Sequence, residues 1–197
     1  MKYNEIVNPL SNQSFKNWFG DSKVVDMHGN PMVMYHGTDA DFETFHPWSH
    51  FGTSIAANDR LGFHYKKEQE NLKLIPVYLK IENPLLVDDK ESDNEACLFN
   101  SLLRTVTYEA IIDRENLWSP EILERIKQGL TQRIKKYRLD EIDFDFARKN
   151  GICSALKQIG YDGLVYINEV EDFGQDSWVI FNPNQVRSIF QTLNWDK

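Results

Sequence analysis

The chain has 197 residues, 41% of them hydrophobic, which is enough to bury the core of one ordinary domain. Its formal net charge of −8 disfavours unspecific attraction to nucleic acid, because Lys and Arg are needed to neutralise phosphates. A nucleic-acid target is therefore disfavoured but not excluded. No run of about 18 apolar residues is present, so we expect a soluble, cytoplasmic protein, and delivery into another cell would leave no mark in the sequence. The two cysteines, Cys97 and Cys153, lie far apart and predict free thiols and no metal site.

The first predicted elements are a short helix and a hairpin. Residues 13–19 place three aromatic side chains at helical spacing, with Ser14 as the expected N-cap and Gly20 as the stop. Turn-forming residues between 26 and 31 separate two apolar segments. We therefore predict a pair of strands, the second of which ends at His36.

A short strand, a helix and a longer strand follow. Residues 49–53 predict a strand with a polar end, and Ser54 is the expected cap of the next helix, which continues through residues 55–61. The segment 74–81 is rich in strand-forming residues. Pro76 has no backbone N–H to donate, so it predicts an edge position for this strand.

The middle of the chain predicts helices and the last third returns to strands. Residues 88–95 are mostly charged and predict a solvated loop, after which the pattern is helical from about 95 to 150. The clearest signal is Ser119-Pro120, a cap with proline at the first helical position, followed by an apolar stripe. Residues 164–167 and 178–181 are apolar runs typical of strands buried on both faces.

Strands near both ends and helices between them favour an α+β fold, with one domain over residues 1–197 that carries a helical insertion over about 95–150. The common signatures of enzyme sites are missing from the sequence, including the glycine-rich dinucleotide loop, the Walker loop, His-Glu-x-x-His and zinc spacings. What remains are polar or flexible groups where apolar strands stop. They lie in four segments: 35–38, 50–53, 160–163 and 176–186.

Three parts of the chain resemble one family. Residues 15–38, with Trp18-Phe19-Gly20-Asp21 and Tyr35-His36-Gly37-Thr38, are similar to the opening of the ADP-ribosyltransferase domains of phage and mobile-element polyvalent proteins. Tyr161-Asp162-Gly163 and the Asp-Ser-aromatic to Phe-Asn-Pro-x-Gln ending over 176–185 resemble the close of the same domain. The joint occurrence of these parts in the right order is fairly specific, and it brackets nearly the whole chain, although the helical middle is unmatched.

The resemblance implies a split β-sheet with the substrate NAD in the cleft between its halves. The wider superfamily, which includes diphtheria toxin and the poly(ADP-ribose) polymerases, carries a His on its first core strand. Breaking the nicotinamide–ribose bond passes through an oxocarbenium-like state, so the site must hold a ribose, a carboxamide and a developing positive charge. On this resemblance the residues of the first strand end that bind NAD are Tyr35, His36, Gly37 and Thr38.

Each of these residues has an expected role. His36 bonds a ribose hydroxyl, although a strand-end His with a purely structural role is the alternative. The Gly37 backbone approaches the carboxamide because no side chain intervenes, and Thr38 supports the turn.

Further NAD contacts are expected from His50, Phe51, Arg60 and Tyr65. Phe51 packs either under the nicotinamide ring or in the core. Arg60 either reaches the NAD phosphates or faces water, as most helix arginines do. Tyr65 is a candidate for the tyrosine of the superfamily motif, and Gln185 is expected either to contact the sheet or to act directly.

The acidic catalytic residue is the least determined part of this expected site. The superfamily often carries a Glu near its last strands, and the match places Ser177 there, whose hydroxyl supplies no negative charge. Asp176 is adjacent and ranks first among the carboxylates, although alternation along a strand turns it to the other face unless a bulge re-aims it. Glu171 ranks second, on the preceding loop with Glu169 and Asp172. The candidate catalytic residues are therefore His36, Ser177, Asp176 and Glu171.

Two functions follow from the resemblance. The first is an NAD-dependent mono-ADP-ribosyltransferase that modifies a macromolecular acceptor, with a protein favoured, as a toxin or effector; NAD hydrolysis is its limiting case. The second is a catalytically degenerate module that binds NAD or a protein on the same fold. The acceptor stays open, because loop surfaces such as 39–50 and 168–176 select it.

Overall fold

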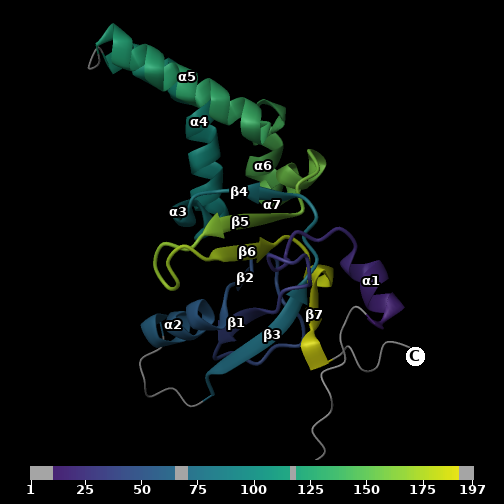
Figure 1. Cartoon of the computed structure of the whole chain (residues 1–197). Helices are drawn as coiled ribbons and strands as arrows, with labels where there is room; N and C mark the ends of the chain where they lie inside the picture. Colours follow the sequence, from purple (N-terminus) through teal and green to yellow (C-terminus); the bar gives the residue numbers. More distant parts are fainter. Residues whose placement is uncertain (1–10, 65–70, 116–118, 191–197) are drawn as a thin grey trace, which may run out of the picture. The chain divides into compact units, whose positions relative to one another are not determined.

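In the computed structural model, which describes residues 11–64, 71–115 and 119–190, strands and helices separate along the chain (Figure 1). Met1–Pro84 and Asp162–Lys197 form one unit, the sheet unit, and Leu85–Tyr161 form another, the helical unit. The mixed helix-and-sheet class predicted from the sequence is confirmed. That the chain is one domain with a helical insertion stays a prediction.

The first sheet of the sheet unit contains β1 (Met34–Thr38), β3 (Lys73–Leu79) and β7 (Val186–Ser188) in the order β1-β3-β7, all antiparallel. β3 is central, so the expected edge position of Pro76 was wrong. Tyr35, opposite Pro76, turns its own N–H and C=O to Gly52, and β7 pairs only with residues 77–79. The missing N–H of Pro76 therefore leaves no ladder hydrogen bond unmade.

The second sheet contains β2 (His50–Phe51), β6 (Asp176–Ile180) and β5 (Gly163–Ile167), again antiparallel. An isolated bridge between Tyr35 and Gly52 connects β1 to the end of β2 through backbone hydrogen bonds of 2.8 and 3.0 Å. β4 (Pro84–Leu86) spans the point where the chain passes from the sheet unit into the helical unit. The split sheet of the superfamily stays a prediction.

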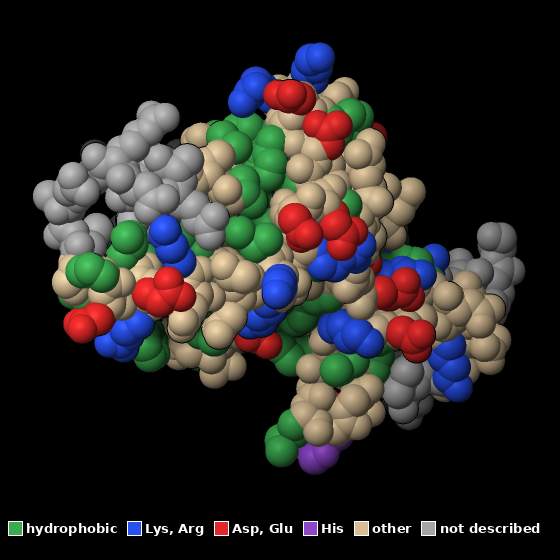
Figure 2. All heavy atoms as spheres, turned by 90° about the horizontal axis from the view of Figure 1, so that it is seen from above, with side chains coloured by type: hydrophobic (Ala, Val, Ile, Leu, Met, Phe, Trp, Pro, Cys, Tyr) green, Lys and Arg blue, Asp and Glu red, His purple; other side chains and the backbone are tan. Residues whose placement is uncertain are grey.

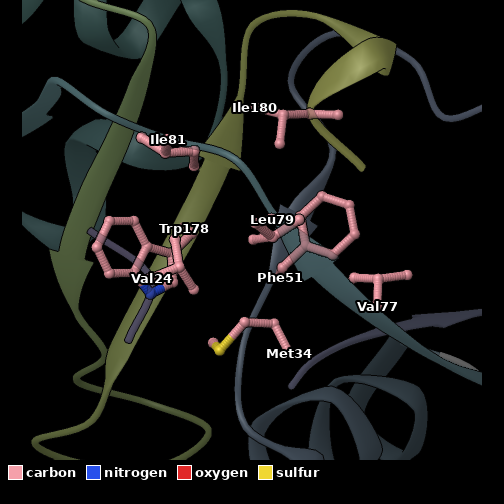
Figure 3. Close-up of a cluster of buried hydrophobic side chains, with 8 residues drawn as sticks. All are labelled: Val24, Met34, Phe51, Val77, Leu79, Ile81, Trp178 and Ile180. Carbon is pink, nitrogen blue, oxygen red and sulfur yellow. The ribbon is translucent and has the colours of Figure 1, made fainter. Parts of the chain in front are cut away.

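The core of the sheet unit contains side chains from β1, β2, β3 and β6 that point toward one another (Figure 3). Its buried members are Val24, Met34, Phe51, Val77, Leu79, Ile81, Trp178 and Ile180. Since Trp178 points into this core, its neighbours Ser177 and Val179 point to the opposite face of the second sheet.

Three boundaries differ from the sequence predictions in the N-terminal part. Asn12, and not Ser14, caps α1 (Gln13–Phe19), because its side chain accepts hydrogen bonds from the first backbone N–H groups. The first arm of the predicted hairpin makes only an isolated bridge between Val25 and Pro31, and β1 continues past His36 to Thr38 because β3 pairs along its full length. The stop at Gly20 is confirmed.

The helix α2 (Ser54–His64) begins at Ser54, so this residue is not its cap. Thr53 takes that place, since its Oγ1 accepts a hydrogen bond of 3.1 Å from the Ala56 N–H. An N-cap lies one residue outside the helix, and either neighbouring hydroxyl fits the sequence pattern.

The helical unit contains α3 (Asp89–Ser92), α4 (Glu95–Glu115), α5 (Pro120–Tyr137), η2 (Leu139–Glu141), α6 (Phe144–Asn150) and α7 (Ile152–Gln158). The predicted cap at Ser119 is confirmed. The expected solvated loop over 88–95 was wrong, because a capping box between Asp88 and Glu91 starts α3. Glu91 is buried and accepts hydrogen bonds from Ser101 and Arg133.

On the face of the molecule drawn in Figure 2, basic and acidic side chains are interspersed and form no patch of one sign. Within the described ranges, no helix has both the length and the apolar character needed to cross a membrane. Among the same residues, no three His, Cys, Asp or Glu side chains are grouped as a metal ion would need. Cys97 and Cys153 are free thiols, as predicted.

Candidate functional site

Polar side chains line the face of the second sheet that lies opposite the Trp178 core. Ser177 pairs with Tyr166, and His50 pairs with Val179, so His50, Tyr166 and Ser177 share this face. His50 Nδ1 lies 3.1 Å from Tyr166 Oη. Ser177 is 2% exposed, and a Cβ atom at Gly52 would lie 3.2 Å from its Oγ. Glycine at position 52 thus leaves room for the Ser177 hydroxyl.

The loop between β5 and β6 brings a carboxylate to this serine. Asn168 follows β5, and its Nδ2 donates to Glu171 Oε2 at 2.9 Å and to Ser177 Oγ at 3.3 Å. Glu171 is therefore linked to Ser177 through one amide group, although the two lie six positions apart along the chain.

The same loop is tied to α2 and to its cap. Arg60 Nη1 lies 3.2 Å from Glu171 Oε1, in an ion pair whose side chains are 55% and 14% exposed, respectively. Thr53, the cap of α2, donates from Oγ1 to Asp172 Oδ2 at 2.5 Å. Two loop carboxylates are thus held by separate partners, Glu171 by Arg60 within α2 and Asp172 by the cap of the helix.

The two strand-end histidines are partly enclosed. His36 Nδ1 lies 2.7 Å from the carbonyl oxygen of His50, to which it donates. Burial lowers the pKa of His50 to about 4, and the positive charge of Arg60 acts in the same direction. Burial also lowers the pKa of His36, against the opposing effect of its hydrogen bond to His50. Both imidazoles are therefore neutral at pH 7.

His36 lies in an aromatic cluster. Its ring centroid is 5.3 Å from that of Phe45, 5.4 Å from that of Phe51 and 6.1 Å from that of Phe42. Phe51 itself is buried in the core of the sheet unit. The packing role that the sequence left open for Phe51 is thus present, and His36 makes more packing contacts than a side chain at an open strand end.

The other residues of the first strand end have structural roles as well. A Cβ atom at Gly37 would lie 2.3 Å from the carbonyl oxygen of Ala57, so the close approach of α2 by itself requires glycine there. Thr38 is buried and accepts a hydrogen bond from Ala40, as expected for a residue that supports the turn. Tyr35 forms the bridge to Gly52. Tyr65 lies outside the described residues.

The carboxylates predicted near the last strand separate into two groups. Asp176 pairs with Ile167 at the end of β6, and both side chains are exposed on the face away from Ser177. No bulge re-aims Asp176, since its pairing register continues unbroken through Ser177. Glu171 and Asp172 lie with the polar face instead. The structure therefore brings together His50, Ser177, Glu171 and Arg60, and it separates Asp176 from them.

Sequence reasoning missed Asn168, Tyr166 and Thr53 as members of this site. An Asn directly after an apolar strand is a turn signal, and this signal could have found Asn168. The sequence contains no comparable signal for Tyr166, because an aromatic residue in an apolar strand is typical of a core position.

Two side chains in the segments that resemble the close of the family's domain have structural contacts. The Gln185 side chain accepts from the N–H groups of Phe181 and Asn182 and donates to the carbonyl oxygens of Lys80 and Asp162, which confirms its expected contact with the sheet. The Asp162 carboxylate accepts from two backbone N–H groups, those of residues 82 and 83. Both side chains hold strand ends together.

The family model described as ADP-ribosyltransferase in polyvalent proteins matches residues 26–195. The matched span contains all the strands described above and every member of the polar face, whereas α1 precedes it. Neither the curated proteins nor the solved structures contain a match to the chain.

Proposed function

Because the chain belongs to the family of ADP-ribosyltransferases in polyvalent proteins, we propose that it is a mono-ADP-ribosyltransferase with NAD as its substrate. It transfers the ADP-ribosyl group to a macromolecular acceptor, with a protein side chain favoured. Family membership supports ADP-ribosyl transfer in general. The choice of NAD chemistry, residues and acceptor is our proposal.

The observation that carries the proposal is the link from Glu171 through Asn168 to Ser177. In the reaction, the bond between ribose C1′ and the nicotinamide nitrogen breaks, nicotinamide leaves with the bonding electrons, and the acceptor bonds to C1′ and loses a proton. Positive charge develops on the ribose meanwhile, and a fixed carboxylate lowers the energy of this state. Glu171 supplies the negative charge that Ser177 lacks.

The neighbouring groups suit the same reaction. His36 and His50 are neutral at pH 7, so they can bond ribose hydroxyls without adding positive charge beside an oxocarbenium-like state. The Arg60 side chain is about half exposed, and it is available to the NAD phosphates if it leaves Glu171. Tyr35, Gly37, Thr38, Phe51 and Tyr65 complete the proposed NAD-binding set.

A second function, a module that binds NAD or a protein without turnover, is favoured by one specific observation. Both oxygens of Glu171 already have partners, Arg60 on one side and Asn168 on the other. If these contacts persist with NAD bound, the carboxylate has less freedom to face the ribose.

Incubation of the pure protein with labelled NAD and a cell lysate distinguishes the two functions. A transferase releases free nicotinamide and leaves label on a macromolecule, whereas a module raises its melting temperature with NAD and does neither. Glu171→Gln should abolish the label, and Asp176→Asn, on the other face, should keep it. Absence of both a melting shift and turnover at millimolar NAD would contradict the whole proposal.

The proposal includes a cytoplasmic site of action and a role as a toxin or effector. Expression of the wild type inside cells should then slow growth, and expression of Glu171→Gln at the same level should not. Equal growth of the two strains would remove the toxin role and leave the transferase reaction untouched.

A further inference from the structure

The loop over residues 169–175 is folded around one side chain. Asn168 Oδ1 accepts hydrogen bonds from three successive backbone N–H groups, those of Val170 at 3.0 Å, Glu171 at 2.7 Å and Asp172 at 3.1 Å. Its own backbone bonds Gln175 and Gly174 across the loop. At 2% exposure, Asn168 is among the most buried polar residues of the sheet unit.

The other end of the same amide points to the candidate site. Nδ2 donates to Glu171 Oε2 and to Ser177 Oγ. Asn carries an acceptor oxygen and two donor hydrogens on one short side chain, whereas an Asp carboxylate of the same shape offers acceptors alone. The loop fold needs the acceptor, and the contact with Glu171 needs the donors.

We propose that Asn168 is the positioning residue of this site: its carbonyl folds the loop, and its amide group turns the Glu171 carboxylate toward Ser177. The role in turnover rests on the proposed transferase function. The orientation of Glu171 is a property of the folded protein and can be measured without turnover.

The substitution Asn168→Asp separates the two halves of this role. The loop keeps its acceptor, but a carboxylate then faces the Glu171 carboxylate where a donor stood. The other charged or titratable groups around the pair are Arg60 from α2, Asp172 from the loop, and His50 and Tyr166 from the strands. They are the same in wild type and variant, so a difference between the two belongs to position 168.

A charge-swapped pair tests the orientation without NAD. Asn168→Asp should lower the melting temperature by roughly 5 °C, the scale of one lost buried contact in a chain of this size. Adding Glu171→Gln exchanges donor and acceptor between the two positions and should restore most of the loss. If N168D unfolds outright, a folded double variant still supports the proposal. A double variant no more stable than N168D, or a single variant as stable as wild type, overturns it.

Kinetics test the role in turnover. N168D should lower kcat about 100-fold with KM within about threefold, since the carboxylate acts on the transition state. As the pH falls and the two carboxylates share a proton, a donor returns, and the kcat of N168D should rise relative to wild type. Asn182→Asp, at an exposed cap in the same unit, is the matched control and should behave as wild type.

An unchanged kcat in N168D overturns the positioning role. A wild type without turnover would instead contradict the proposed function, and the charge-swapped pair would still decide whether Asn168 orients Glu171.

Discussion

Buried hydroxyl groups in the two units of the chain have different kinds of partner. In the helical unit the hydroxyl partners are local: Ser92 Oγ donates to the Asp89 carbonyl oxygen, and Thr105 Oγ1 to that of Ser101, whereas the buried Glu91 carboxylate accepts from Arg133, 42 residues away. In the sheet unit they are distant in sequence: Ser22 Oγ donates to the carbonyl oxygen of Leu79, 57 residues away. The candidate site follows the second pattern, because Thr53 and Asp172 are 119 residues apart. Chemistry in this chain is thus expected where strands and loops from both ends of the sequence meet.

Side-chain burial also differs between the core of the sheet unit and α5 of the helical unit. The core of the sheet unit contains eight buried side chains (Figure 3). In contrast, α5 of the helical unit buries no residue fully and half-buries one apolar stripe. The stripe consists of Leu123, Ile126, Leu130 and Ile134. Substitutions in this core should therefore have larger effects than matched substitutions in α5.

The largest effect is expected in turnover. Glu171→Gln should lower the NAD turnover rate by about 100- to 1,000-fold and leave NAD binding within about threefold, because it removes one fixed charge that acts on the transition state. Arg104→Ala, on α4, should leave turnover within about twofold. Nicotinamide release and calorimetric titration with NAD measure the two quantities. A large loss in Arg104→Ala would show that the reaction depends on both units.

Acid should destabilise the sheet unit, since it contains His36 and His50, whose pKa values are lowered by burial. Burial lowers the folded-state pKa of His50 from 6.5 to about 4, so the unfolded chain binds more protons between these values. The contribution that His50 makes to the free energy of unfolding is fully present above about pH 6.5 and is lost as the pH falls toward 4. We expect this contribution to be about 2–3 kcal/mol.

Urea unfolding of wild type and His50→Gln at pH 7 and pH 4.5 measures this contribution. The variant should lose less stability on acidification than wild type, and His46→Gln, at an exposed position, should behave as wild type. Equal pH dependence of His50→Gln and wild type would assign the acid response to other groups.

The smallest effects are expected from two glycines. Gly37→Ala should destabilise the protein by about 1–3 kcal/mol, because its Cβ would meet the Ala57 carbonyl oxygen at 2.3 Å and push α2 away. Gly129→Ala, in α5 with no atom within 4 Å of the new Cβ, should stabilise it by about 0.5–1 kcal/mol. Thermal unfolding distinguishes the two signs, and a loss at Gly129 would contradict the open packing of α5.

Much of the fold could be predicted from local signals. The stop at Gly20, the cap at Ser119, the helical middle and the strands around 164–167 and 178–181 depend on residues within a few positions of one another, and the structure has them. The predictions failed by one or two residues where neighbouring residues offered the same chemistry, as Asn12 and Ser14 do for α1.

The candidate site was only partly predictable. The family resemblance marked His36, His50, Ser177 and Arg60, and the structure places the last three around one polar face. Asp176 ranked above Glu171 in the sequence because it adjoins Ser177. Which loop carboxylate lies near the sheet depends on how Asn168 folds the loop. No periodic pattern in the sequence indicates that fold.

The sequence by itself determined the class of fold, the positions of most elements and the family, since these follow from local spacing and from short segments in a fixed order. Only the tertiary structure decided that β3 is central despite Pro76, that α2 accounts for Gly37, and that Glu171 and not Asp176 is linked to Ser177 through Asn168. The physical reason is the range of the interactions. Helix periods and caps act over about four residues, whereas a strand's neighbours and a buried amide's partners are set by which distant segments pack together.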